Sequence, residues 1–377
     1  MSNLKSKQNI KCVGVDDGHS NTKVFAGYDS AGKPIQEIIQ SVVRKGSTSF
    51  TTVDEKELED ATIMLDGEIY TVGSKYAGQG DDLVYDGYPV SGKNVALITQ
   101  SLRRFVERWG KKPVDLSIVT GLPLGHYFDN AQDAVNDELI NKKVANVERI
   151  EKAFSPADNN ESMFTVVCNS VQPEGWGSFL DLILDERAEP TERFDIVKDY
   201  GTVIVDIGGR TVDTMVVKAN VMTAVYRDIH TYDLGILYLY RDIVGFIMQK
   251  ENLREAPTRD KIDALIRTGK WGRRDRDYSS VIKQIIDRFV DDIFGSIKAV
   301  VSREEAEGGV VVTGGGAELL GDYLKQRIEE YNDKAEVIIP EHPVFSNARG
   351  FWKKSVSNKL DYEAKVAKGL VKSDKKG

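Results

Sequence analysis

The chain has 377 residues, of which 41% are hydrophobic and 29% charged, and its net charge is −8. This composition fits a soluble globular protein of two or more domains, and the negative charge argues against a protein that coats nucleic acid through electrostatics alone. The N-terminal stretch lacks the apolar run of a signal peptide, and no apolar run is long enough to span a membrane. Cys12 and Cys168 lie in apolar, strand-like runs, which favours buried thiols in a reducing compartment. We therefore expect a cytoplasmic protein without membrane association.

The first half of the chain predicts a mixed α/β domain. The expected elements are strands over 11–16, 24–29 and 33–43, a small strand-rich subdomain over about 34–92, a helix over 94–109, a strand over 114–123, a helix over 128–143, a strand over 163–171 and a helix that opens at Glu174. Residues 187–200 are polar and contain Pro190, which is typical of a linker between two halves.

The second half repeats this plan. The expected elements are strands over 202–207, 211–218 and 221–227, helices over 236–249 and 257–269, a charged loop over 271–278, a helix over 279–307, a buried strand over 308–316, a helix over 317–331, a strand over 335–341 and a helix from 347. The tail from Lys353 is rich in lysine and sparse in apolar residues, which favours a solvated or frayed helix.

Two glycine turns follow strands that end in aspartate, DDGHSNTK from Asp16 and DIGGRTVD from Asp206. Glycine lets backbone N–H groups approach an anion, and an aspartate at a strand end can hold hydrated Mg²⁺. A third turn, Thr313–Glu318 (TGGGAE), lets a flat ring or sugar lie against the backbone before a helix. One such turn alone is more often a plain tight connection, but the repetition favours a phosphate-binding site. The sequence contains no P-loop motif.

Five motifs in order resemble those of the actin, Hsp70 and sugar-kinase superfamily, and the wording is closest to that of ParM-like plasmid-segregation actins. They are DDGHSNTK at Asp16, GLPLGHYFD at Gly121, PE at Pro173, DIGGRTVD at Asp206 and GGGAEL at Gly314. The P-E order is typical of ParM-like proteins, whereas Hsp70 and MreB have the reverse order. The resemblance implies an actin-like (ribonuclease H-like) α/β fold with duplicated domains flanking a nucleotide cleft. These domains would be 1–190 plus 346–377, and 191–345 with an inserted helical subdomain over about 236–285.

The resemblance also implies a role for each matching residue. Glu174 would orient the attacking water, while Asp16 and Asp206 would hold Mg²⁺. The implied nucleotide-binding residues are Asp17, Gly18, His19, Ser20, Asn21, Lys23, Gly208, Gly209, Arg210, Thr211, Gly314, Gly315, Gly316 and Glu318. Two of them depart from the family pattern, because His19 stands where serine or threonine is usual and Arg210 replaces a small residue.

The function implied by the resemblance is an ATPase that polymerises on binding Mg-nucleotide and drives plasmid DNA segregation, with filaments destabilised by hydrolysis. Its cofactors would be ATP, or alternatively GTP, and Mg²⁺. Its partners would be further copies of itself and a DNA-binding adaptor protein, with no direct nucleic-acid or membrane contact. Two alternatives stay open, a small-molecule kinase of the same fold and a nucleotide-binding scaffold that does not hydrolyse. Glu174 argues against the scaffold, since it supplies a group that can position water.

Overall fold

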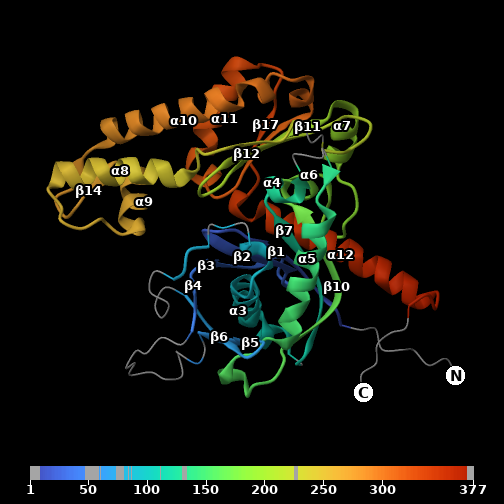
Figure 1. Ribbon diagram of the computed structural model, residues 1–377. Coiled ribbons are helices and arrows are strands. Elements are labelled where there is room, and N and C mark those ends of the chain that lie inside the picture. Colours follow the sequence, from blue (N-terminus) through green and yellow to red (C-terminus); the bar gives the residue numbers. More distant parts are fainter. Residues whose placement is uncertain are drawn as a thin grey trace. The chain divides into compact units, whose positions relative to one another are not determined.

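The computed structural model describes residues 9–46, 59, 61–73, 80–83, 85, 87–110, 112–129, 134–224 and 228–371. The chain forms two compact units, each considered by itself below. Unit 1 consists of Met1–Phe194 together with Phe345–Gly377, and unit 2 consists of Asp195–Val344. Figure 1 labels many of the elements of both units.

Unit 1 is built on a five-stranded sheet with the order β3-β2-β1-β7-β10. Its strands are β1 (Lys11–Asp17), β2 (Asn21–Tyr28), β3 (Pro34–Gln40), β7 (Val114–Leu122) and β10 (Phe164–Pro173). The first three strands are antiparallel neighbours, whereas β1, β7 and β10 are parallel to one another. Successive side chains of β1 point to opposite faces of the sheet, so their contacts show which helices cover each face.

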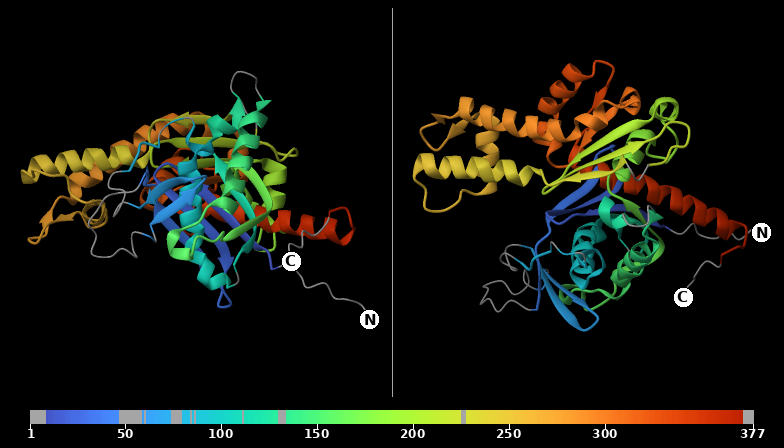
Figure 2. Two further views of the ribbon diagram at one scale, coloured as in Figure 1. Left: turned by 60° about the horizontal axis from the view of Figure 1, so that its bottom comes forward. Right: turned by 45° about the horizontal axis from the view of Figure 1, so that its top comes forward.

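Helices cover both faces of the sheet of unit 1 (Figures 1 and 2). Val13 and Val15 point into the core on the side of α3 (Gly92–Trp109), and α5 (Asp137–Glu148) packs beside β10. Gly14 points to the other face, where a Cβ atom would lie 2.0 Å from the carbonyl oxygen of Ala348. The backbone of α12 (Ser346–Ala367) therefore lies directly on β1, with α6 (Trp176–Ile183) packed beside it.

A small three-stranded sheet, with the order β4-β6-β5, packs against α3 in unit 1. Its strands are β4 (Val43–Lys45), β5 (Thr62–Leu65) and β6 (Glu68–Val72). The subdomain that the sequence predicted over 34–92 contains this sheet, but β3 within that range pairs with β2 in the main sheet. The remaining short elements are η1 (Tyr88–Val90), α4 (Leu124–Tyr127), β8 (Phe128–Asp129), β9 (Ala134–Val135), η2 (Arg149–Lys152) and η3 (Pro156–Asp158).

Unit 2 repeats the sheet of unit 1. Its order is β13-β12-β11-β16-β17, with antiparallel pairing among the first three strands and parallel pairing of β11, β16 and β17. The strands are β11 (Thr202–Ile207), β12 (Val212–Val217), β13 (His230–Tyr232), β16 (Val310–Thr313) and β17 (Val337–Ile338). The duplicated α/β architecture that the sequence predicted is therefore confirmed.

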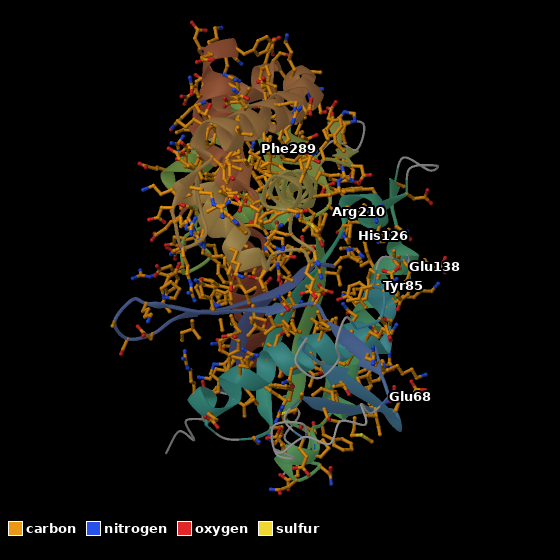
Figure 3. The ribbon with its side chains drawn as sticks, turned by 90° about the vertical axis from the view of Figure 1, so that its left-hand side faces the viewer. Glu68, Tyr85, His126, Glu138, Arg210 and Phe289 are labelled. Atoms are coloured by element: carbon orange, nitrogen blue, oxygen red, sulfur yellow. The ribbon has the colours of Figure 1, made fainter. Side chains whose placement is uncertain are left out.

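Four helices share one apolar core with the sheet of unit 2. They are α8 (Ile236–Glu251), α9 (Arg259–Thr268), α10 (Ser279–Val301) and α11 (Ala317–Tyr331). Phe289, labelled in Figure 3, is one of the residues that α10 contributes to this core. The hairpin of β14 (Lys270–Trp271) and β15 (Arg276–Asp277) stands where the charged loop over 271–278 is expected, and η5 (Glu304–Gly308) ends the expected helix over 279–307 early.

One prediction for the middle of the chain is wrong, and another is incomplete. The helix expected over 128–143 begins only at Asp137, where Asn136 caps it by accepting a hydrogen bond from the Leu139 amide (3.1 Å); residues 130–133 lie outside the described part. The linker expected over 187–200 does contain the boundary between the two units, after Phe194, but it also contains α7 (Glu192–Tyr200), which buries Val197.

One prediction nearer the C-terminus is wrong. In place of a strand over 221–227, Ala224 forms one isolated bridge, and the positive φ of Asn220 and Met222 turns the chain; residues 225–227 are outside the described part. The tail predicted as a solvated or frayed helix is the second part of α12, which continues to Ala367 and is mostly exposed from Leu360 on. Its first residue, Lys353, is buried, and its ammonium group pairs with Asp181 at 2.8 Å.

Candidate functional site

The predicted site residues of unit 1 gather at one edge of its sheet. β1, β7 and β10 are parallel neighbours, so their carboxyl ends lie at the same edge. Asp16 and Asp17 end β1, Leu122 ends β7, and Glu174 directly follows the end of β10. The β1–β2 turn is at this edge too, because β2 begins there at Asn21. The fold therefore brings the first predicted phosphate-binding turn and Glu174 to the same edge of the sheet.

The β1–β2 turn is braced by an ion pair and by a neighbouring strand end. Lys23 faces Asp16 across the hairpin, and its Nζ lies 2.8 Å from Asp16 Oδ2. The Ser41 hydroxyl donates to the Gly18 carbonyl (2.6 Å), and the Ser41 amide donates to the Ser20 carbonyl (3.1 Å). A Cβ atom on Gly18 would lie 3.6 Å from Asp16 Oδ1, so the turn runs directly beside the ion pair.

Asp17 points to the opposite face of β1 from Asp16, into the layer of α3 and α5. Its Oδ2 accepts hydrogen bonds from Asn94 Nδ2 and from Lys143 Nζ. Lys143 is completely buried, and its Nζ also donates to Asn94 Oδ1 at 2.8 Å. The structure thus shows Asp17 as the anchor of the turn on two helices. Its role in nucleotide binding stays a prediction.

Tyr88 packs against the turn. Its side chain is buried, and its ring centroid lies 5.2 Å from that of His19. Burial, with the negative charge of Asp17 and more weakly that of Glu174, raises the pKa of Tyr88 far above its usual value. Its phenol is therefore neutral. His19, which departs from the family pattern, packs against an aromatic ring here.

The predicted phosphate-binding turn of unit 2, Gly208–Thr211, is closed by a hydrogen bond from the Gly208 amide to the Thr211 carbonyl (2.8 Å). The first turn of α8 holds it, because the Gly235 amide donates to the Arg210 carbonyl (2.7 Å) and the Leu237 amide to the Gly209 carbonyl (2.9 Å). A Cβ atom on Gly235 would lie 2.1 Å from the carbonyl carbon of Arg210, so only glycine fits.

The side chains of this turn have distinct partners. Arg210, labelled in Figure 3, is 58% exposed and lies 3.5 Å from Asp233. Thr211 donates its hydroxyl to Asp213 Oδ2 (2.8 Å), and Thr231 donates to the other carboxylate oxygen (2.5 Å). Burial raises the pKa of Asp213, while the two hydroxyl donors oppose that effect. Asp213 therefore orients the hydroxyl of Thr211.

The third turn packs onto the end of β11, so unit 2 brings two predicted nucleotide-binding segments together. Thr313 pairs with Asp206 across the parallel strands β16 and β11. A Cβ atom on Gly314, where φ is +86°, would lie 2.2 Å from Asp206 Oδ1. One on Gly316 would lie 2.2 Å from Ile207 Cγ2. Glu318 lies in the first turn of α11, directly after these glycines.

Each unit therefore presents an aspartate at the end of its first strand beside a glycine turn. Mg²⁺ bound to a nucleotide usually takes one or two protein carboxylates and completes its shell with phosphate oxygens and water. Asp16 and Asp206 fit that pattern, since both are acceptor-only carboxylates next to backbone that can approach a phosphate. In unit 1 the Lys23 ammonium group lies against Asp16 and is within reach of the same turn.

Two family models match the chain. Residues 14–177 match "Actin like proteins N terminal domain", and residues 204–326 match "Archaeal actin homologue MreB-like, C-terminal". The two matches fall on successive parts of the chain and together span most of it. Both models describe actin-like families, so each of these two parts of the chain is similar to actin-like proteins.

Solved structures show the same fold. An archaeal actin homologue in complex with ADP has a TM-score of 0.64 at 21% identity, covering 92% of this chain and 98% of its own. The pSK41 ParM protein has a TM-score of 0.66 at 16% identity, with 94% and 100% covered. The ParM of a 15-stranded filament from Clostridium botulinum has 0.63 at 19% identity, with 93% and 100% covered. A search of curated sequences gave no significant match. Among the described residues, no helix has the length and apolarity needed to cross a membrane.

Sequence reasoning missed several residues that support the site. Asn94 directly precedes the apolar run Val95–Ile98, and polar residues are common at a helix start, so the sequence gives no signal that this side chain is buried. Lys143 follows Lys142 in an otherwise ordinary charged helix, and nothing in the sequence separates the buried lysine from the exposed one. Gly235 and Asn347 contact turns that are distant along the chain, so no local pattern points to them.

Proposed function

We propose that this chain is an actin-like ATPase of the ParM type. It binds Mg·ATP and polymerises into filaments, and hydrolysis destabilises those filaments. The observation that carries the proposal is the common sheet edge of unit 1, where Glu174 and the Asp16–Lys23 turn lie together. The ADP bound to the archaeal homologue and the filament formed by the Clostridium botulinum ParM support nucleotide binding and self-assembly.

The roles of the residues follow from the chemistry of phosphoryl transfer. Backbone amides of the glycine turns and the Lys23 ammonium group bind the phosphates and offset their negative charge. Glu174 accepts a hydrogen bond from a water molecule, orients it toward the γ-phosphate and takes up its proton as the new P–O bond forms and the bond from the γ-phosphorus to the leaving ADP oxygen breaks. Mg²⁺, held by Asp16 and Asp206, would supply further charge neutralisation at the phosphate oxygens.

In the cytoplasm, the filament would push plasmid copies apart through a DNA-binding adaptor protein. The support for this part is the similarity to ParM proteins. The negative net charge favours recognition of DNA through an adaptor over direct contact.

Glu174→Ala tests the proposal. The parent should scatter light and form filaments in negative stain when Mg·ATP is added, and it should release phosphate without any added substrate. The variant should bind Mg·ATP like the parent, release phosphate roughly 10²-fold more slowly, and form filaments that persist. Glu186→Ala, which alters an exposed glutamate just after α6, is the matched control.

Three outcomes would contradict the proposal. A parent that stays monomeric with Mg·ATP is not a polymerising actin. A parent that releases no phosphate, but converts ATP to ADP when a small hydroxyl compound is added and transfers the phosphoryl group to that compound, is a kinase. A Glu174→Ala variant with parental phosphate release removes Glu174 from hydrolysis.

A further inference from the structure

Helix α6, which directly follows Glu174, has no capping side chain of its own. The residue at its N-cap is Gly175, and the cap comes instead from Asn347 on α12. Asn347 Oδ1 accepts hydrogen bonds from the Gly175 amide (2.9 Å), the Ser178 amide (3.1 Å) and the Ser178 hydroxyl (3.1 Å). All three bonds are buried, so they bind the first turn of α6 to a helix far along the chain.

The two helices are also locked by close backbone contact and by a second cap. A Cβ atom on Gly350 would lie 1.7 Å from the Gly177 carbonyl oxygen, which leaves no space for any side chain there. At the other end of α6, Lys353 Nζ donates to the carbonyl groups of Asp181 and Leu184, both at 2.7 Å. Helix α12 therefore caps both ends of α6.

Glu174 itself lies between these fixed points. Its amide donates to the Leu122 carbonyl at the end of β7 (2.8 Å). A Cβ atom on Gly121 would lie 3.3 Å from Glu174 Cγ and 3.1 Å from the ring of Phe351. The next residue, Gly175, has a φ of +78°, a conformation that glycine leaves readily when nothing holds it. The hydrogen bond from the Gly175 amide to Asn347 supplies that restraint.

We propose that Asn347 is a positioning residue for hydrolysis, which fixes the Glu174–Gly175 backbone and thereby the direction of the Glu174 carboxylate. This inference rests on the proposed ATPase function. The carboxylate must hold water in line with a phosphorus atom, and a displacement of about 1 Å at such a group can slow a reaction by 10²-fold. Asn347 touches neither water nor nucleotide in this role, so its loss should affect turnover and spare nucleotide affinity.

The test uses three variants of the full chain. Asn347→Ala removes the acceptor, and Asn347→Asp retains an oxygen at the same position that can accept the same three bonds. Asn358→Ala is the matched control, because Asn358 is on the same helix but bonds to Ser170 on β10. Each protein is assayed for Mg·ATP affinity, for phosphate release, and for amide hydrogen exchange over residues 174–180 without nucleotide.

We expect Asn347→Ala to exchange its Gly175 and Ser178 amides roughly tenfold faster, as expected for a lost helix cap. Its phosphate release should fall roughly 10- to 10²-fold at unchanged affinity for Mg·ATP. Asn347→Asp should restore both properties, and Asn358→Ala should match the parent in both.

Parental exchange and parental turnover in Asn347→Ala would overturn the inference. So would faster exchange with parental turnover, since the cap would then not position Glu174. An equal fall in affinity and turnover in Asn347→Ala and Asn358→Ala would show general damage to unit 1 and would also overturn it. If Asn347→Ala does not fold, Asn347→Asp decides by the same measurements, because loss of turnover despite a retained acceptor contradicts the capping role. A parent without phosphate release refutes the proposed function, whereas the exchange measurement still reports on the cap.

Discussion

Packing in unit 2 requires only two of the three consecutive glycines after β16. Gly314 has positive φ and lies against Asp206, and Gly316 lies against Ile207. Gly315 differs, because the nearest atom to a Cβ there is Val344 Cγ2 at 3.7 Å, an ordinary contact distance. A glycine that packing does not require has another reason to be small, and the approach of a nucleotide is the reason that the proposed function offers.

Alanine substitutions at Gly314 and Gly315 distinguish an effect on stability from an effect on nucleotide binding. Gly314→Ala should destabilise unit 2 by about 1–3 kcal/mol, through strain and the clash with Asp206. Gly315→Ala should change the stability by less than about 1 kcal/mol but weaken Mg·ATP binding. Thermal unfolding and nucleotide titration of both variants measure this. Equal losses of stability in the two variants, or a parental nucleotide affinity in Gly315→Ala, would contradict this assignment of Gly314 to packing and Gly315 to binding.

Asp17 and Lys143 form a buried ion pair next to the β1–β2 turn. Lys143→Met leaves the Asp17 carboxylate buried without its cation, which should cost about 3–5 kcal/mol of unfolding free energy. Lys142→Met is the natural comparison, since Lys142 is exposed and pairs with Glu138 one turn away. That change should cost less than about 0.5 kcal/mol. Denaturant unfolding of the two proteins checks the difference, and similar small losses would mean that Asp17 does not depend on Lys143.

Among the elements, the β14–β15 hairpin is a candidate filament contact, because it carries Arg273 and Arg274 on its exposed tip. If it is a contact, reversing both charges should raise the critical concentration for assembly severalfold, more strongly at low salt. Arg273→Lys with Arg274→Lys keeps the charge and should assemble like the parent. Sedimentation across a salt series measures both, and parental assembly of the reversed variant would exclude the hairpin.

The sequence predicted those elements well whose limits are set by local pattern. Apolar runs that stop at aspartate gave β1 and β11, and helical spacing gave α3 and α11. It missed details that depend on a side-chain contact. Asn136 sets the start of α5 through its own cap, and the Asp181 carboxylate holds Lys353, the first residue of the lysine-rich tail, in the buried part of α12.

The residues of the candidate site also form two groups, those that the sequence predicts and those that it does not. Its turns and carboxylates could be predicted, because phosphate chemistry restricts them to a few residue types at fixed spacing. The residues that hold them could not. Asn94 and Lys143 meet Asp17 from two different helices, and Asn347 reaches Gly175 from the far end of the chain. Such contacts depend on the completed fold of unit 1.

For the molecule as a whole, the division into two units makes unit 2 a continuous insertion into unit 1. Unit 2 has its own sheet and apolar core, so a fragment of residues 195–344 should fold alone. Residues 1–194 lack α12, which buries Ala348 and Phe351 against the sheet, and should not melt cooperatively. Circular dichroism melts of the fragments test this.

A peptide of residues 345–377 should restore cooperative melting to the fragment of residues 1–194. The same peptide with Phe351→Ala should do so poorly, since it lacks the ring that packs beside Gly121. Cooperative melting of residues 1–194 alone would show that α12 is dispensable for the fold of unit 1.

This discontinuity also orders events on the ribosome. The strands of the first sheet leave the exit tunnel early, but the helix that must cover one face of that sheet is made last. Translation proceeds at ~5–20 residues per second, so that apolar face stays uncovered for on the order of ten seconds while unit 2 is made. Each nascent chain therefore passes through a period in which half of its fold is finished and the other half is exposed, the situation in which chaperones bind.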